Sequence, residues 1–167
     1  MSELQNLYDR AADGKLRELA DRIDICMFCT GSNLPLDVRP MSTLKVDDDG
    51  FLYFFSSAKS FKNHAIKNKD AVQLFYANPG QFEFMDLYGT ATVTRDMMLI
   101  DELWNDMHKA WFPDGKDDPT LTVIIVRPEQ GYYWDTKQGV MVSFLKILTA
   151  AATGKTMDGG IEGELSL

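Results

Sequence analysis

Short runs rich in β-branched and aromatic residues recur along most of this chain, separated by turn-sized intervals. The clearest turn is Asp49-Gly50, a pair that readily supplies positive φ, between the runs at 38–46 and 51–55. Because neighbouring runs are joined mainly as hairpins, we expect an antiparallel sheet, and closing it into a barrel would remove its exposed edges. The other predicted strands are 22–30, 71–77, 82–94 with a bulge or bend at Gly89, and 121–127, which Pro128 interrupts and 132–134 resume.

Helical spacing of apolar residues appears between and around these runs. One helix is predicted over 3–20, and another over 57–69, where Phe61, Ala65 and Ile66 share a side. Asp96 is the expected N-cap of a helix that extends to about Lys109, and a last apolar helix is expected over 138–152. The sequence therefore predicts a mainly β fold, a β-barrel with peripheral helices, as one domain over 1–153 with a polar, Gly-rich tail over 154–167.

Composition excludes several classes of function. The formal charge of -8, from 17 basic and 25 acidic residues, would repel a nucleic-acid backbone. No run approaches the roughly 18 apolar residues of a membrane span, and the N-terminus is polar, so we expect a cytoplasmic protein with neither a nucleic-acid nor a membrane partner. The basic residues between Lys59 and Lys69 still allow a single small anion to bind.

No metal site is expected. Cys26 and Cys29 lack a second Cys pair or a nearby His, and their apolar, strand-like surroundings favour buried, reduced thiols over a redox motif. The run Asp47 to Asp49 lacks the spaced ligands of a calcium loop and is interpreted as a turn. His64 and His108 are interpreted as structural residues.

Two consecutive segments carry a family resemblance. The first reads Arg39-Pro40-Met41-Ser42-Thr43-Leu44-Lys45, and the second runs from Phe54 through Ser57 to His64. Together they resemble the FMN-binding split barrels of the pyridoxamine phosphate oxidase family, and the segments 109–115 and 133–135 narrow the likeness to the branch that resembles general stress protein 26. The resemblance implies a six-stranded antiparallel Greek-key split barrel that works as a homodimer with its cofactor at the subunit interface.

The resemblance also implies roles for individual residues. Arg39 on the second strand and Lys62 on the following helix would hold the FMN phosphate, the backbone at Met41 and Ser42 would border the flavin ring, and Trp111 would cover the cofactor of the second subunit. The predicted cofactor-binding residues are Arg39, Pro40, Met41, Ser42, Phe55, Ser56, Ser57, Lys62 and Trp111.

The residue types suit this chemistry. A phosphate with about two negative charges is bound by a guanidinium, an ammonium, hydroxyl donors and helix N-terminal amides, which Arg39, Lys62, Ser56, Ser57 and a helix opening near Ser57 would supply. Taken alone, Arg39 is an ordinary exposed strand residue and Lys62 a solvated helix residue. Trp104, Trp111 and Trp134 are, without the resemblance, simplest as core or interface residues.

Two departures from the family pattern limit the function. Phe61 occupies the place of a second basic residue and Phe84 that of a Gln, and the oxidase's substrate-binding end is missing, so pyridoxamine phosphate oxidation is not expected. The leading hypothesis is an FMN-binding, stress-related protein that acts as a flavin-dependent oxidoreductase on a small molecule, with FAD as an alternative cofactor. A non-catalytic module that sequesters or senses flavin is the second hypothesis, and a barrel that has lost FMN is the third.

Overall fold

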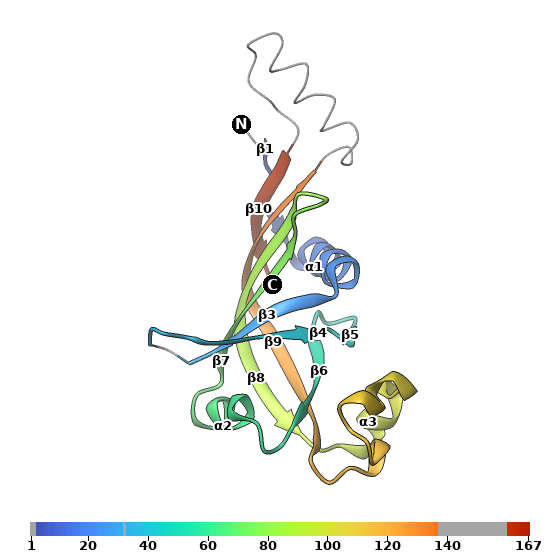
Figure 1. Cartoon of the computed structure of the whole chain (residues 1–167). Coiled ribbons are helices and arrows are strands. Elements are labelled where there is room, and N and C mark those ends of the chain that lie inside the picture. Colours follow the sequence, from blue (N-terminus) through green and yellow to red (C-terminus); the bar gives the residue numbers. More distant parts are fainter. Residues whose placement is uncertain (1–2, 32, 137–159) are drawn as a thin grey trace.

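The computed structural model describes residues 3–31, 33–136 and 160–167, and one curved sheet dominates it (Figure 1). The described residues contribute ten strands to this sheet. Their bounds are β1 Glu3–Leu4, β2 Leu7–Tyr8, β3 Ile25–Thr30, β4 Asp37–Ser42, β5 Lys45–Val46, β6 Leu52–Ser57, β7 Ala71–Asn78, β8 Glu83–Thr94, β9 Leu121–Thr136 and β10 Gly160–Ser166. The helices are α1 Asp9–Ile23, α2 Phe61–Asn68 and α3 Met97–Leu103, with 3-10 turns η1 Asp106–Ala110 and η2 Gly115–Asp117.

The sheet curls into a split barrel that is not closed. Its pairing order is β1-β10-β9-β8-β7-β3-β4, while β6 pairs with β9 and β5 with β6. The predicted strand 38–46 divides at Thr43 and Leu44, whose amides donate to Asp24 O at 3.0 Å and Tyr53 O at 2.8 Å. Its first half stays with β3 and its second half crosses to β6. The predicted mainly β fold is confirmed, whereas the closed barrel is wrong, and β1 and β2 pair with β10 in parallel rather than antiparallel.

Strand β9 changes its neighbour halfway along. Its residues 121–126 pair with β6 and its residues 130–136 with β10, while its other edge pairs with β8 from Val123 to Trp134. The register against β8 shifts between Tyr88 and Gly89, which confirms the bulge predicted there. Pro128 lies in this bulge and does not interrupt the strand, because a bulge tolerates a residue without a backbone N–H.

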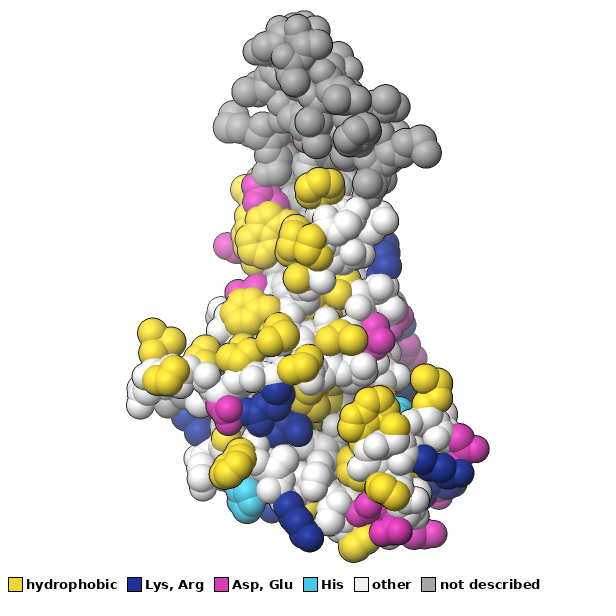
Figure 2. Space-filling view, viewed as in Figure 1, with side chains coloured by type: hydrophobic (Ala, Val, Ile, Leu, Met, Phe, Trp, Pro, Cys, Tyr) yellow, Lys and Arg dark blue, Asp and Glu magenta, His cyan; other side chains and the backbone are white. Residues whose placement is uncertain are grey.

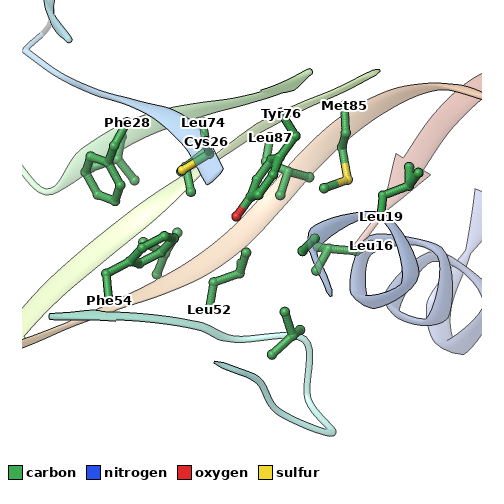
Figure 3. Close-up of a cluster of buried hydrophobic side chains, with 14 of the residues drawn as sticks. Leu16, Leu19, Cys26, Phe28, Leu52, Phe54, Leu74, Tyr76, Met85 and Leu87 are labelled. Atoms are coloured by element: carbon green, nitrogen blue, oxygen red, sulfur yellow. The ribbon is translucent and has the colours of Figure 1, made fainter. Parts of the chain in front are cut away.

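The main core lies inside the curl of the sheet. Alternate side chains of β3, β7 and β8 point into this core, which Leu16 and Leu19 of α1 join at one end, and Phe28 meets Phe54 edge-on with ring centroids 5.3 Å apart (Figure 3). Cys26 and Cys29 are buried free thiols on β3, as predicted, and burial raises the pKa of Cys26 to about 12. A thiol with such a pKa stays protonated and unreactive at neutral pH.

Several helix boundaries differ from prediction. Helix α1 begins at Asp9, because residues 3–8 contribute β1 and β2 to the sheet. Asp96 caps α3 as predicted, accepting from Met98 N at 2.9 Å, but α3 ends at Leu103 and η1 continues. Residues 160–166 of the expected tail form β10 instead, while the helix expected over 138–152 and the domain boundary at 153 lie outside the described residues. None of the helices in the described ranges has the length and apolar character needed to cross a membrane.

We expect Gly89→Ala to destabilise the fold by roughly 1–3 kcal/mol, because a Cβ there would lie 2.2 Å from the carbonyl oxygen of Arg127 and 2.8 Å from Pro128 Cα. Gly14→Ala is the control. Gly14 lies within α1, and a Cβ added there would have no neighbour within 4 Å, so this change should stabilise the fold by about 0.5–1 kcal/mol. Urea unfolding of both variants measures this contrast. Equal stability of Gly89→Ala and wild type would show that the bulge relaxes freely.

Candidate functional site

The fold brings two basic side chains together, one from β4 and one from α2. Arg39 lies opposite the buried Phe28 in the β3–β4 register, so its side chain starts from the inner face of the sheet. Lys62 is the second residue of α2 and is partly buried. Burial, followed by repulsion from the nearby Arg39 guanidinium, lowers the pKa of Lys62. The predicted pair is therefore close enough in space for the two charges to interact.

The two cations are unequally compensated. Arg39 forms an ion pair with Asp37 of the same strand, at 2.5 Å between Nη2 and Oδ2. In the described part of the chain, Lys62 forms no ion pair with a carboxylate. Figure 2 shows a group of Lys and Arg side chains just below the β3–β4 hairpin in this view. This uncompensated charge at the edge of the core favours binding of an anion.

A buried polar network holds the start of α2 against β6. Ser56 Oγ donates to Asn63 Oδ1 at 2.7 Å, Asn63 Nδ2 donates to Thr122 Oγ1 at 2.9 Å, and Thr122 Oγ1 donates to Ser56 O at 2.6 Å. The N-cap is Ser60 and α2 begins at Phe61, four residues after Ser57, where the helix was predicted to begin. The hydroxyl of Ser56 is thus engaged in fixing α2, which in turn positions Lys62.

Asn63 was not recognised from the sequence as part of the site. It is 1% exposed and occupies the same side of α2 as the buried Ile66. An amide on the apolar side of an amphipathic helix must find buried hydrogen-bond partners, and this position is the pattern that could have identified Asn63.

The predicted ring-binding residues of β4 alternate between two faces. Arg39 and the partly buried Met41 share the inner face, where Met41 packs on the main core, whereas Pro40 and Ser42 are exposed on the outer face. Among the described strands, β4 pairs only with β3, so every second backbone amide of β4 points away from the sheet. This free edge supplies hydrogen-bond groups beside Arg39.

Phe55 and Ser57 lie on the face of β6 opposite Ser56. The Phe55 ring packs against Trp104, His108 and Phe112, with centroids 5.9, 4.8 and 6.3 Å away. Burial lowers the pKa of His108, whose Nδ1 accepts from Asn105 N, so the imidazole has a structural role in this cluster. Trp111 follows η1 with 72% of its side chain exposed, free to contact a molecule outside the chain.

On the outer face of the sheet, α3 and η1 pack on β6 and on the first half of β9, whereas large apolar side chains elsewhere on this face are exposed. We call this exposed part the open face, defined by the exposed residues Ile25, Met27, Val38, Phe75, Tyr88 and Trp134. Figure 2 shows hydrophobic side chains along this side of the strands. A hollow of about 810 Å³ opens on the same face between β7 and β10, and the described residues that line it include Asp86, Glu129 and Glu164 but no Lys or Arg. A phosphate therefore fits the Arg39–Lys62 pair and not the hollow.

The donor set around the pair suits a phosphate monoester. A guanidinium, an ammonium that has no carboxylate partner among the described residues, and the edge of β4 converge there, and an anion between the two cations would relieve their mutual repulsion. A divalent metal finds no comparable set, since no group of three or more His, Cys, Asp or Glu in the described ranges is arranged to hold one. The residues present therefore fit the phosphate end of a nucleotide-like cofactor.

Comparison with known proteins places this arrangement in a family. General stress protein 26 of Bacillus subtilis is 30% identical over 81 residues. A Jannaschia sp. CCS1 protein assigned to general stress protein 26 superposes with a TM-score of 0.77 at 24% identity, covering 92% of this chain and 99% of its own. The general stress FMN/FAD binding protein of Xanthomonas citri superposes with a TM-score of 0.65 at 21% identity, covering 77% of this chain and 91% of its own.

Protein bli-3 of Neurospora crassa is 24% identical over 126 residues, which cover 70% of this chain and 60% of bli-3. The match to the B. subtilis protein covers 47% of this chain and 57% of that protein. The family model described as pyridoxamine 5'-phosphate oxidase like matches residues 11–158, which include most of α1, Arg39, Lys62 and the whole of β9. The chain belongs to the pyridoxamine 5'-phosphate oxidase-like family.

Proposed function

We propose that this protein binds FMN, with the phosphate at the Arg39–Lys62 pair, and acts as a stress-related flavin-dependent oxidoreductase on a small molecule. The observation that carries the proposal is the uncompensated charge of Lys62 beside Arg39. The Xanthomonas citri protein of the same fold, described as FMN/FAD binding, supports a flavin rather than another phosphate ester.

The chain's own residues would divide the work of holding FMN. Arg39 and Lys62 neutralise the phosphate, the Ser56–Asn63–Thr122 network keeps Lys62 in position, and the free edge of β4 offers amides to polar ring atoms. When bound, FMN supplies hydride transfer at N5, and the protein supplies position and electrostatics. No side-chain acid or base is needed for that step, and none is assigned.

We further propose that the protein is a homodimer formed through the open face. Six large apolar side chains, between 39% and 53% exposed, share this face, and contiguous apolar surface of this kind marks protein interfaces. Trp111 is 72% exposed, and in this proposed dimer it would be the residue that covers the cofactor of the second copy.

The flavin proposal predicts a saturable titration of the purified protein with FMN, followed by flavin absorbance or fluorescence. Arg39→Ala and Lys62→Met should each weaken binding by about 10-fold or more, since each removes a charge-assisted contact. Lys67→Met, an exposed residue of the same helix, should leave the affinity unchanged. Absence of FMN binding by the wild type would refute the proposal.

A turnover assay on the FMN-loaded protein distinguishes an oxidoreductase from a module that only sequesters flavin. If NAD(P)H reduces the bound flavin and an added acceptor reoxidises it over many turnovers, the oxidoreductase is supported. A flavin that binds but is not turned over by any donor and acceptor tested would support the sequestering module instead.

The lowered pKa of Lys62 predicts that the flavin-free protein becomes more stable when this charge is removed. The folded state binds the Lys62 proton less tightly than the unfolded state, so the charged Lys62 lowers the free energy of unfolding. This loss of stability is fully present below the pKa of Lys62 in the folded state, and it disappears as pH rises through the ordinary lysine range. Lys62→Met should therefore be the more stable form at pH 7, with an advantage that shrinks towards pH 11. Urea unfolding at both pH values measures it.

Saturating FMN should reverse that order of stability, because ligand binding stabilises wild type by about 2.7 kcal/mol at 100 times the dissociation constant and the variant by less. Lys67→Met should show neither the higher stability without FMN nor the reversed order of stability with FMN. A flavin-free Lys62→Met that is less stable than wild type at pH 7 would contradict the charge argument.

The dimer proposal predicts that Met27→Lys, a single change at the centre of the open face, converts the wild-type dimer to monomers in sedimentation or light scattering. Met98→Lys, which lies on α3 and is 83% exposed, should leave the dimer intact. Trp111→Ala should keep the dimer and weaken FMN binding. A monomeric wild type at micromolar concentration would disprove this interface.

A further inference from the structure

The Arg39–Lys62 pair has an exposed aromatic ring at its outer margin. Phe61 is the first residue of α2 and precedes Lys62, and 85% of its side chain is exposed. Successive residues of an α-helix are about 100° apart around its axis. Because Asn63 faces the buried network on one side of Lys62, Phe61 lies on the other side, towards solvent.

The surroundings of Phe61 leave room for a group larger than a terminal phosphate. Lys59 and His64 near the start of α2 are also exposed, so the described chain does not close over this end of the site. A ligand whose phosphate lies between Arg39 and Lys62 would extend any further group past the ring of Phe61.

The charge of the pair agrees with such an extended ligand. Asp37 already compensates Arg39 at 2.5 Å, and Lys62 adds one positive charge. A terminal phosphomonoester concentrates about two negative charges on one phosphorus, whereas a diphosphate diester carries one per phosphorus. The pair therefore matches one phosphate of a diphosphate at least as well as a monoester.

We propose that Phe61 is a stacking platform for the adenine of a flavin dinucleotide, so that this site takes FAD through a contact that FMN lacks. The inference rests on the flavin proposal above and names the ligand class of the same site. Bases stack on aromatic side chains with energies that correspond to roughly 10-fold or more in affinity.

The test compares FAD with FMN on the full chain. Dissociation constants are measured by titration for wild type, Phe61→Ala, the conservative Phe61→Trp, and Met98→Ala, which removes an equally exposed apolar side chain elsewhere. We expect Phe61→Ala to weaken FAD about 10-fold and FMN less than about 2-fold, with Phe61→Trp retaining FAD affinity. ADP, which has the diphosphate and adenine without the flavin ring, should compete with FMN on wild type and less well on Phe61→Ala.

The outcomes separate the two proposals. Binding of FMN with no binding of FAD, or an equal change for both flavins in Phe61→Ala, would overturn the role of Phe61 and leave the FMN proposal standing. A wild type that binds neither flavin would overturn both.

Discussion

The exchange of neighbours along one edge of β9 determines how the rest of this protein is arranged. Below the bulge at Pro128 the strand hydrogen-bonds to β6, and above it to β10, although the chain continues through all sixteen residues. A proline has no backbone N–H to contribute, so Pro128 fits the point where this edge of β9 pairs with neither β6 nor β10. One half of the molecule thus forms around β6 and α2, and the other around β10 and α1.

This division also creates the candidate site. Strand β4 remains with β3 while β6 follows β9, so the two strands separate, and α2, which follows β6, lies against β8 and β3. The network of Ser56, Asn63 and Thr122 then fixes the first turn of α2 at that position, which keeps Lys62 near Arg39. The fold accepts an unfavourable pairing of like charges there, as proteins do at binding sites where stability and function conflict.

Much of the sheet could be predicted from the alternation of residues, because strands such as β7 and β8 have one buried and one outer face. The start of α2 could not, because Ser57 pairs with Leu121 in the sheet, and tertiary pairing overrode local helical spacing. Strand β10 was missed since its glycines suggested a tail. Gly163 is required there instead by close packing, as a Cβ would lie 1.9 Å from Gln5 O.

The site was predictable only in part. Family resemblance identified Arg39 and Lys62, and the structure brings them together. Strand alternation places Phe55 and Ser56 on opposite faces of β6, but it could not show that Ser56 faces α2 while Phe55 packs with the α3 cluster. Asn63 was missed because its importance comes from Thr122, a residue far away in the chain. Such partners become visible only in three dimensions.

The parallel pairing of β1 and β2 with β10 imposes an order on folding. These strands join residues that are far apart in the sequence, and a hydrogen bond between them and β10, from Glu164 N to the side chain of Asn6, spans 158 positions. Contacts of such separation form late, because the entropy of closing the loop is lost before the contact is gained. During synthesis, residues 3–8 therefore have no place in the sheet until residues 160–166 leave the ribosome, and α1 must dock on a sheet whose β10 edge is still vacant.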